Sequence, residues 1–243
     1  MTGGGTGVGK EIALQMADAG AFVTITGRRQ AQLDAVAGLH ANIAGFSADV
    51  TDRASLKALV RTATGGWGEI SIAVANAGAA NSVPFSRMTE EDWKDTLEIN
   101  LTGVFHTFQA VLPGMEKSGW GRLISVASTA GLKGYSYVSA YCAAKHGVVG
   151  LTKSLSLELA TKGITVNTVC PGFTETPMLE RSIENIMTKT GMDPESARKA
   201  LTSTNPQGRF IQPEEIASTI CWLCEETSGS VTGQAISVSG GEI

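Results

Sequence analysis

The feature that most constrains the fold is a regular alternation, along the whole chain, of short apolar runs with longer segments of helical period. The runs are rich in β-branched residues and lie at 22–26, 42–47, 70–75, 123–126, 164–169 and 235–238. The helical segments lie at about 30–39, 51–62, 90–111, 139–160 and 213–225. This alternation predicts a parallel sheet with helices on both faces. We therefore expect one doubly wound α/β domain spanning residues 1–243.

Composition narrows the class of partner. The chain of 243 residues has a formal net charge of −4 and only 17% charged residues, which argues against a nucleic-acid partner. No apolar run approaches the ~18 residues of a membrane span, and the first residues lack the basic and apolar regions of a signal peptide. The four cysteines are too few for a secreted disulfide scaffold, so we expect reduced thiols and a cytoplasmic protein.

Two of these cysteines form a Cys221-x-x-Cys224 motif, which can mark a redox or zinc site. No second such motif or histidine pair accompanies it, and the flanking Ile220 and Leu223 favour buried positions of a helix. The three histidines have no metal-ligand spacing. We therefore predict no metal site.

A glycine-rich turn opens the chain. Gly3, Gly7 and Gly9 have the spacing G-x-x-x-G-x-G and precede a helical pattern, although the usual G-x-G-x-x-G fingerprint is absent. Residues without Cβ let the backbone approach a pyrophosphate whose charge lies at a helix N-terminus. A glycine turn that binds no ligand is the alternative interpretation.

The strongest chemical signal is Tyr141-x-x-x-Lys145 in the predicted helix 139–160. Residues four apart lie on one helix face, and an ammonium beside a phenol lowers the pKa of the phenol. Tyr141 is then a candidate proton donor to a carbonyl or acceptor from an alcohol. Ser128 follows the strand 123–126, at the end where doubly wound sheets place their sites. An exposed tyrosine with an unrelated lysine is the alternative.

Taken together, these motifs resemble the short-chain dehydrogenases/reductases over essentially the full length. The resemblance rests on motifs in this order: Thr2-Gly-x-x-x-Gly-x-Gly9, Asn76-Ala-Gly78, Asn100, Ser128, Tyr141-x-x-x-Lys145 and Pro171-Gly172. Within that family, the segments 170–178 and 232–241 look like those of the 3-oxoacyl-thioester reductases of fatty-acid and polyketide synthesis.

The resemblance implies roles for four catalytic residues. Tyr141 would be the general acid/base, and Lys145 would bind the nicotinamide ribose and depress the pKa of Tyr141. Ser128 would bind the substrate carbonyl oxygen. Asn100 would hold a water that relays the proton; a polar residue that merely kinks a helix is the alternative for it.

The resemblance also implies a dinucleotide site. Besides Tyr141 and Lys145, its residues would be Gly3, Gly7, Val8, Gly9, Arg28, Arg29, Asp49, Val50, Asn76, Gly78, Pro171, Gly172 and Thr176. Asp49 and Val50 would face the adenine, and a simple turn acid is the alternative for Asp49. Gly27 occupies the position where NAD-preferring members carry an aspartate, and Arg28 can meet a 2′-phosphate. NADP(H) is therefore favoured over NAD(H), with a solvated helix start as the alternative for the two arginines.

The segment 176–206 has apolar residues at helical spacing and is predicted to be a substrate lid, with a helical hairpin packed on the core as the alternative. The expected activity is NADP(H)-dependent hydride transfer to a small-molecule carbonyl, with a 3-oxoacyl thioester as the leading substrate. The alternatives are an NAD(H)-dependent dehydrogenase of a secondary alcohol and a non-catalytic binding protein. The resemblance also implies a homotetramer in which the helices at 90–111 and 139–160 pair across a two-fold axis.

The same resemblance implies a Rossmann-like strand order 3-2-1-4-5-6-7, in which strand 1 is central. Only Met1 and Thr2 precede the glycine turn, so strand 1 is expected to be truncated. Unpaired buried backbone groups cost about 1–3 kcal/mol each. We therefore expect a natural chain that begins upstream, and lower stability for the 243-residue form.

Overall fold

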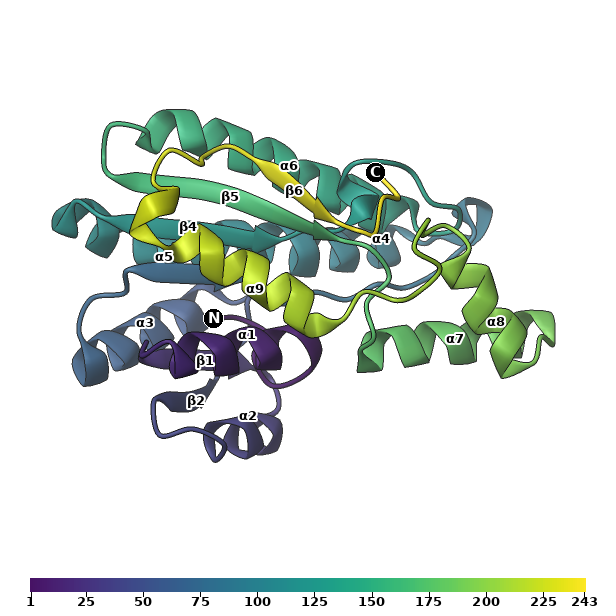
Figure 1. Cartoon of the computed structure of the whole chain (residues 1–243), viewed down its shortest axis with the longest axis horizontal. Helices are drawn as coiled ribbons and strands as arrows, with labels where there is room; N and C mark the ends of the chain where they lie inside the picture. Colours follow the sequence, from purple (N-terminus) through teal and green to yellow (C-terminus); the bar gives the residue numbers. More distant parts are fainter.

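The core of the protein is a twisted parallel sheet, seen here in a computed structural model that describes all residues 1–243 (Figure 1). One edge pairs β1 (Val23–Gly27) with β2 (Ile43–Ser47). The rest runs in the order β3 (Ile72–Ala75), β4 (Gly121–Val126), β5 (Ile164–Pro171) and β6 (Ala235–Val238). Thr2 forms parallel bridges to Thr26 of β1 and Ala75 of β3, and so joins the two parts. The Rossmann-like α/β prediction is confirmed, with Thr2 in the place of a first strand.

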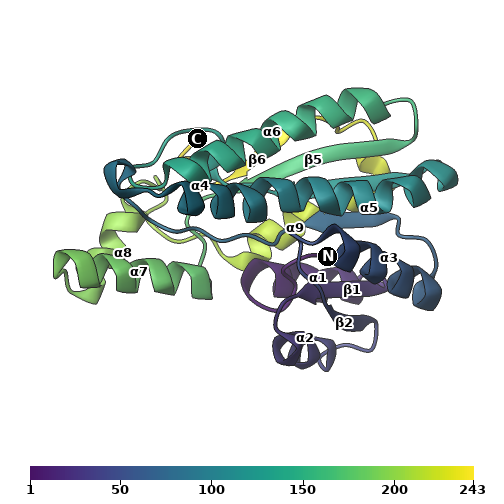
Figure 2. The same ribbon diagram turned by 180° about the vertical axis from the view of Figure 1, so that it is seen from behind.

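Helices cover both faces of this sheet (Figures 1 and 2). α1 (Gly7–Asp18), α2 (Gln30–Ala37) and α9 (Pro213–Cys224) share one apolar cluster, which includes Ile124 of β4. α5 (Gly103–Ser118) and α6 (Ser139–Leu159) share the opposite cluster, which includes the neighbouring Leu123. Successive strand residues point to opposite faces, so β4 contributes to both cores.

Two further helices complete these layers. α3 (Arg53–Trp67) packs beside α5, and α4 (Glu90–Leu97) packs beside α6. Asp52 begins α3 by accepting a hydrogen bond from the amide of Ala54. No helix is both long and apolar enough to cross a membrane. Cys221 and Cys224 lie in α9 as free thiols, and burial raises the pKa of both.

The segment expected to be a lid forms a helical hairpin beyond the carboxyl end of the sheet (Figures 1 and 2). Its helices are α7 (Pro177–Thr190) and α8 (Pro194–Thr202), which begin at the caps Thr176 and Asp193. The hairpin has a small core of its own, separate from the two main clusters, formed by Leu179, Ile183, Ala197 and Phe210.

The start of the chain fills only part of the slot between β1 and β3. The amide of Thr2 donates to Val74 O at 3.0 Å, and the amino group of Met1 donates to Thr24 O at 2.6 Å. A strand residue points its N–H and C=O to the same side, so the amides of Thr24 and Val74 face the slot above Met1. An apolar cavity of about 50 Å³ lies there, lined among others by Leu56, Ile72 and Val111. Burial lowers the pKa of the Met1 amino group to about 5.

This geometry predicts that an added strand would stabilise the protein. About five apolar β-branched residues placed before Met1 would supply two or three backbone bonds of about 1 kcal/mol each. With about 2–4 °C per kcal/mol for a chain of this size, the Tm should rise by about 5–10 °C in calorimetry. A Gly-Ser extension of equal length is the control, and equal Tm values for the two extensions would contradict the prediction.

The buried amino group of Met1 also makes the stability of the chain depend on pH, and the same comparison can measure this dependence. Its pKa is about 5 in the folded chain against 8.0 for an ordinary exposed amino group, so the unfolded chain binds this proton more readily between those values. This group therefore makes the chain less stable as the pH falls from 8 to 5. The apolar extension should remove that contribution.

Candidate active site

The candidate residues gather where the parallel strands end. Arg28 follows β1, Asn76 follows β3, Ser128 follows β4 shortly after its last residue, and Gly172 follows β5. Carboxyl ends of parallel strands meet at one edge of the sheet, which is where open α/β folds bind ligands. The structure thus brings together residues that are far apart in the sequence.

The glycine turn is held by a clamp between Thr2 and Asn76. The Thr2 hydroxyl accepts hydrogen bonds from the amides of Asn76 at 3.0 Å and Ala77 at 3.1 Å. The Asn76 side chain donates back to the carbonyls of Thr2 and Gly3, both at 3.1 Å. A Cβ on Gly9 would collide with the Gly3 carbonyl and the Asn76 amide, so this position requires glycine. The sequence assigns Thr2 no such role, because its partner lies 74 residues away.

The clamp presents the N-terminus of α1 to the sheet edge. Thr6 occupies the N-cap position but makes no side-chain capping bond, and Gly7 has a positive φ of 54°. The first N–H groups of a helix have no partner within it, and they attract anions. Gly7 also lies against Thr176, because a Cβ there would be 3.2 Å from the Thr176 methyl. The glycine turn and the base of the α7–α8 hairpin therefore adjoin.

Two arginines and an aspartate lie beyond β1 and β2. Arg28 and Arg29 are exposed, and no ion pair of the structure involves either of them. The Asp49 carboxylate accepts hydrogen bonds from the backbone amide and the hydroxyl of Thr51, at 3.0 and 2.8 Å. The hydrogen bond from the amide is the main cause that lowers the pKa of Asp49. Its side chain therefore holds the turn at Thr51, and the contact of Asp49 with the adenine stays a prediction. Val50 is buried, and its carbonyl is 3.1 Å from His106 Nδ1.

Asn100 lies in a π-helical turn, Glu98–Thr102, between α4 and α5. It is fully buried, and its amide donates to Thr96 O at 2.9 Å and to Ala79 O at 2.8 Å. These two bonds stabilise the wide turn, and the bond to Ala79 joins the helix to the loop after β3. A Cβ on Gly78 would be 2.8 Å from Asn100 Oδ1 and 3.6 Å from Lys145 Nζ. Gly78 therefore lies between these two predicted site residues.

Tyr141 and Ser128 form the polar centre of the site. Ser128, near the Tyr141 phenol, lowers the phenol pKa, but burial is the larger effect and raises it to about 12. The expected depression of this pKa by Lys145 is therefore wrong for the chain by itself. Removal from water disfavours the phenolate more than the neighbouring groups favour it.

The surroundings of Lys145 explain why its expected effect on the pKa of Tyr141 is weak. Its side chain is buried, and Nζ donates to Val126 O at 2.9 Å and lies 5.5 Å from the centre of the Tyr141 ring. Burial lowers the pKa of Lys145 to about 8. The ammonium therefore faces the ring and a carbonyl at the end of β4.

The loop after β5 is the last segment at the edge of the sheet where the candidate residues gather. The amide of Gly172 donates to Val238 O at 3.0 Å, which places Pro171-Gly172 beside the end of β6. Cys170, which sequence reasoning did not select, is fully buried beside Ser128 and Lys145, and burial raises the pKa of its thiol to about 11. Nothing in its sequence position distinguishes Cys170 from an ordinary core residue.

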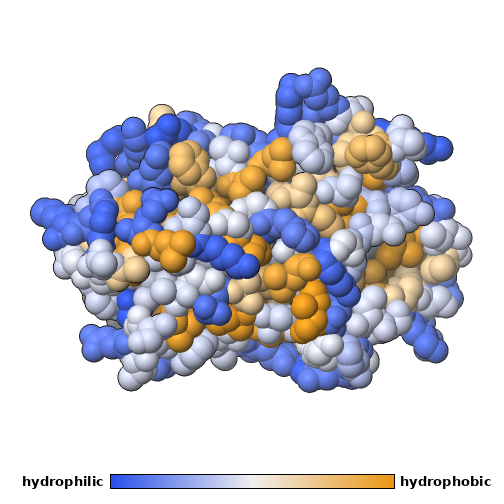
Figure 3. Space-filling view, turned by 90° about the horizontal axis from the view of Figure 1, so that it is seen from above, coloured by the Kyte–Doolittle hydropathy of each residue, from blue (hydrophilic) through white to orange (hydrophobic).

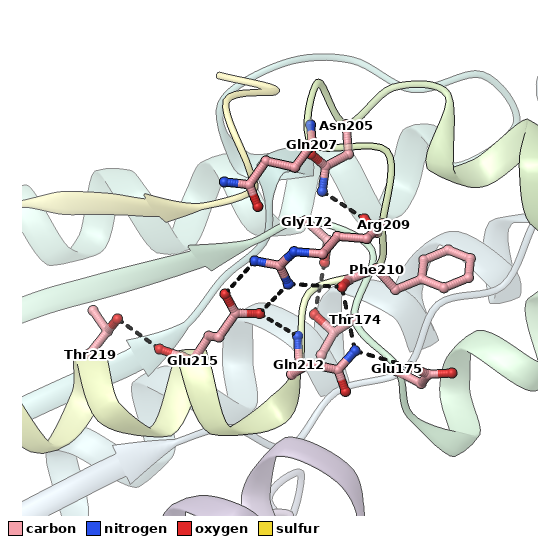
Figure 4. Close-up of polar contacts among 10 residues, drawn as sticks. All are labelled: Gly172, Thr174, Glu175, Asn205, Gln207, Arg209, Phe210, Gln212, Glu215 and Thr219. Carbon is pink, nitrogen blue, oxygen red and sulfur yellow. Dashed lines mark hydrogen bonds and ion pairs between the residues drawn. The ribbon is translucent and has the colours of Figure 1, made fainter.

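The base of the hairpin formed by α7 and α8 is held by polar contacts (Figure 4). Arg209 makes two bonds to the Glu215 carboxylate, at 2.6 and 2.8 Å, just before α9. Gln212 donates to Glu175 at 3.1 Å, across the segments of chain that enter and leave the hairpin. Both connections of the hairpin are therefore anchored to each other and to the start of α9.

The fold and the site together define a Rossmann-like oxidoreductase dependent on NAD(P). A family model described as short chain dehydrogenase matches residues 1–186. The chain belongs to the short-chain dehydrogenase/reductase family.

Full-length relatives support this assignment. The 3-oxoacyl-[acyl-carrier-protein] reductase FabG of Thermotoga maritima is 38% identical, with 99% of this chain and 95% of the relative covered. The D-beta-hydroxybutyrate dehydrogenase of Cupriavidus necator is 36% identical over the same shares. A crystal structure of an actinorhodin polyketide ketoreductase variant with NADPH has a TM-score of 0.96 and 36% identity, covering 99% of this chain and 95% of that one. The family members act on small-molecule carbonyls or alcohols.

Proposed function

We propose that this protein uses NADPH to reduce a 3-oxoacyl thioester to the 3-hydroxyacyl thioester. The observation that carries the proposal is the half-buried Tyr141 phenol, which lies near Ser128 and has Lys145 Nζ 5.5 Å from the centre of its ring. A phenol with a pKa of about 12 is protonated at neutral pH and is ready to donate its proton. Similarity to a FabG reductase and to a polyketide ketoreductase supports this substrate class.

The residues present fit a dinucleotide phosphate. The uncapped start of α1 and the glycine turn provide N–H groups for a pyrophosphate, and Arg28 and Arg29 are free to pair with a 2′-phosphate. When bound, NADPH supplies the hydride. The remaining walls of its site would be formed by Val8, Asn76, Gly78, Val50, Pro171, Gly172 and Thr176.

Side chains of this protein would stabilise the negative charge that develops on the substrate oxygen. Ser128 donates a hydrogen bond to the carbonyl oxygen, and Tyr141 transfers its proton to the same atom as the alcohol forms. Lys145 lies where its ammonium stabilises the resulting phenolate. We propose that Asn100, in the π-helical turn that its side-chain amide stabilises, holds a water that relays the proton outward past Lys145.

An NAD(H)-dependent dehydrogenase of a secondary alcohol is the second candidate, because a D-beta-hydroxybutyrate dehydrogenase is 36% identical. In either case we propose that the hairpin 176–206 covers the substrate. The formation or loss of reduced nicotinamide, followed by its absorbance, separates the two candidates. The reduction is assayed with NADPH or NADH and acetoacetyl-CoA, and the oxidation with NADP⁺ or NAD⁺ and 3-hydroxybutyrate.

The first prediction of this mechanism concerns Tyr141→Phe, which removes the transferable proton and keeps the ring. General acid–base catalysis contributes about 10²–10⁴-fold, so kcat should fall by at least the lower value. Binding of NADPH, measured by fluorescence titration, should change little. A variant that retains most of its turnover would show that the assigned mechanism is wrong.

The second prediction concerns cofactor choice. Arg28→Ala should raise the KM for NADPH about ten- to hundredfold, because a charge-assisted hydrogen bond is worth about 1.5–3 kcal/mol. The KM for NADH, which lacks the 2′-phosphate, should be nearly unchanged. Arg61→Ala, at an exposed position of α3, is a matched control. Equal losses for both cofactors would assign Arg28 a structural role.

We also propose a homotetramer. Phe105 of α5 is 40% exposed and Leu157 of α6 is 82% exposed. Figure 3, viewed from the α6 side, shows apolar patches among the polar residues of this face. Unlike Leu157, the small residues Ala140 and Ala144 of α6 are buried within the subunit. Light scattering should return about four times the 25.3 kDa chain mass, and a monomer at micromolar concentration would contradict the proposal.

A further inference from the structure

The chain's last residues fold back against the loop that follows Ser128. The Glu242 side chain is only 1% exposed, and its Oε1 lies 2.8 Å from Lys133 Nζ and 2.6 Å from the Tyr135 hydroxyl. A buried carboxylate requires such partners, because removing an unpaired charge from water is costly. The proposed reaction uses none of these three side chains.

The hydrogen bonds of this cluster have a defined direction. The Tyr135 phenol has one proton, which it donates to Glu242, so the Thr129 hydroxyl at 2.6 Å must donate to the phenol oxygen. Thr129 follows Ser128 directly and belongs to the same tight turn, in which Ser128 Oγ accepts from the Ala130 amide at 3.1 Å. A continuous polar chain therefore runs from Glu242 to the residue next to Ser128.

Glu242 also faces the loop after β5. A Cβ on Gly172 would lie 3.3 Å from Glu242 Oε2, and the Phe173 ring packs edge-on against Tyr135 with centroids 6.1 Å apart. Two residues earlier, Gly240 lies so close to Asn205 that a Cβ there would collide with the Asn205 amide. Asn205 in turn donates to Arg209 O at 2.7 Å, in the segment that leaves the lid hairpin (Figure 4). The C-terminal segment thus contacts three loops that border the site.

We propose that Glu242 is a positioning residue for the reductase reaction, acting on the loop that presents Ser128 to Tyr141. The inference rests on the proposed function, in which the Ser128 hydroxyl binds the substrate carbonyl oxygen. Lys133 and Tyr135 are the two points at which Glu242 fixes the loop, and Thr129 carries the constraint to Ser128.

A double-mutant cycle tests this role. Glu242→Ala should lower kcat for acetoacetyl-CoA about tenfold, while in a Ser128→Ala background the same change should alter kcat less than about twofold. Glu116→Ala is the matched control, because it removes another Lys–Glu pair, with Lys162, on the surface away from the site. That control should leave kcat unchanged in both backgrounds. The KM for NADPH should stay within about twofold throughout.

Conservative variants keep the test valid if Glu242→Ala folds poorly. Tyr135→Phe removes the same link to Thr129, so it should reproduce the loss of kcat, and combining it with Glu242→Gln should add little. Unchanged turnover in Glu242→Ala or Tyr135→Phe would overturn the proposal. So would equal losses with and without Ser128, which would show a general effect on the fold. Full turnover in Ser128→Ala alone would instead overturn the proposed function.

Discussion

The clamp between Thr2 and Asn76 is the contact on which the rest of the site depends. Thr2 pairs with both halves of the sheet, through Thr26 and Ala75, and its hydroxyl accepts two amides at the end of β3. The same few atoms therefore hold the sheet together and set the position of the glycine turn. Because α1 begins in that turn, the clamp sets the position of its uncapped N-terminus.

Burial determines the electrostatics of the reaction centre. The sequence suggests that a lysine four residues after a tyrosine lowers the tyrosine pKa, but both groups are removed from water, which opposes either charge. The result is a phenol with a pKa raised to about 12 and an amine with a pKa lowered to about 8. A protonated phenol is the form that can donate a proton to a carbonyl oxygen as it is reduced.

Periodicity and turn chemistry predict most of the fold. The apolar runs at 164–169 and 235–238 coincide with β5 and β6, and the helix expected at 139–160 is α6. These elements are local: β5 is buried along its whole length, as expected for a strand covered on both faces, and the buried residues of α6 recur with the helical period of 3.6. The wide turn at Asn100 is different, because its cause is a hydrogen bond to Ala79, 21 residues away. A continuous helical pattern contains no signal for such a turn.

Residue types identify the groups that can react, while tertiary contacts decide how those groups are held. Tyr141, Lys145 and Ser128 stand out in the sequence because a phenol and an amine on one helix face, with a hydroxyl at a strand end, suggest proton transfer. Glu242 has no such context: it stands among the last residues, and its partner Tyr135 lies 107 positions earlier. Only the folded chain shows that this carboxylate is buried against the loop after β4. The supporting contacts of a site are therefore the part that a single sequence conceals, and they are where the structure adds most to the chemistry.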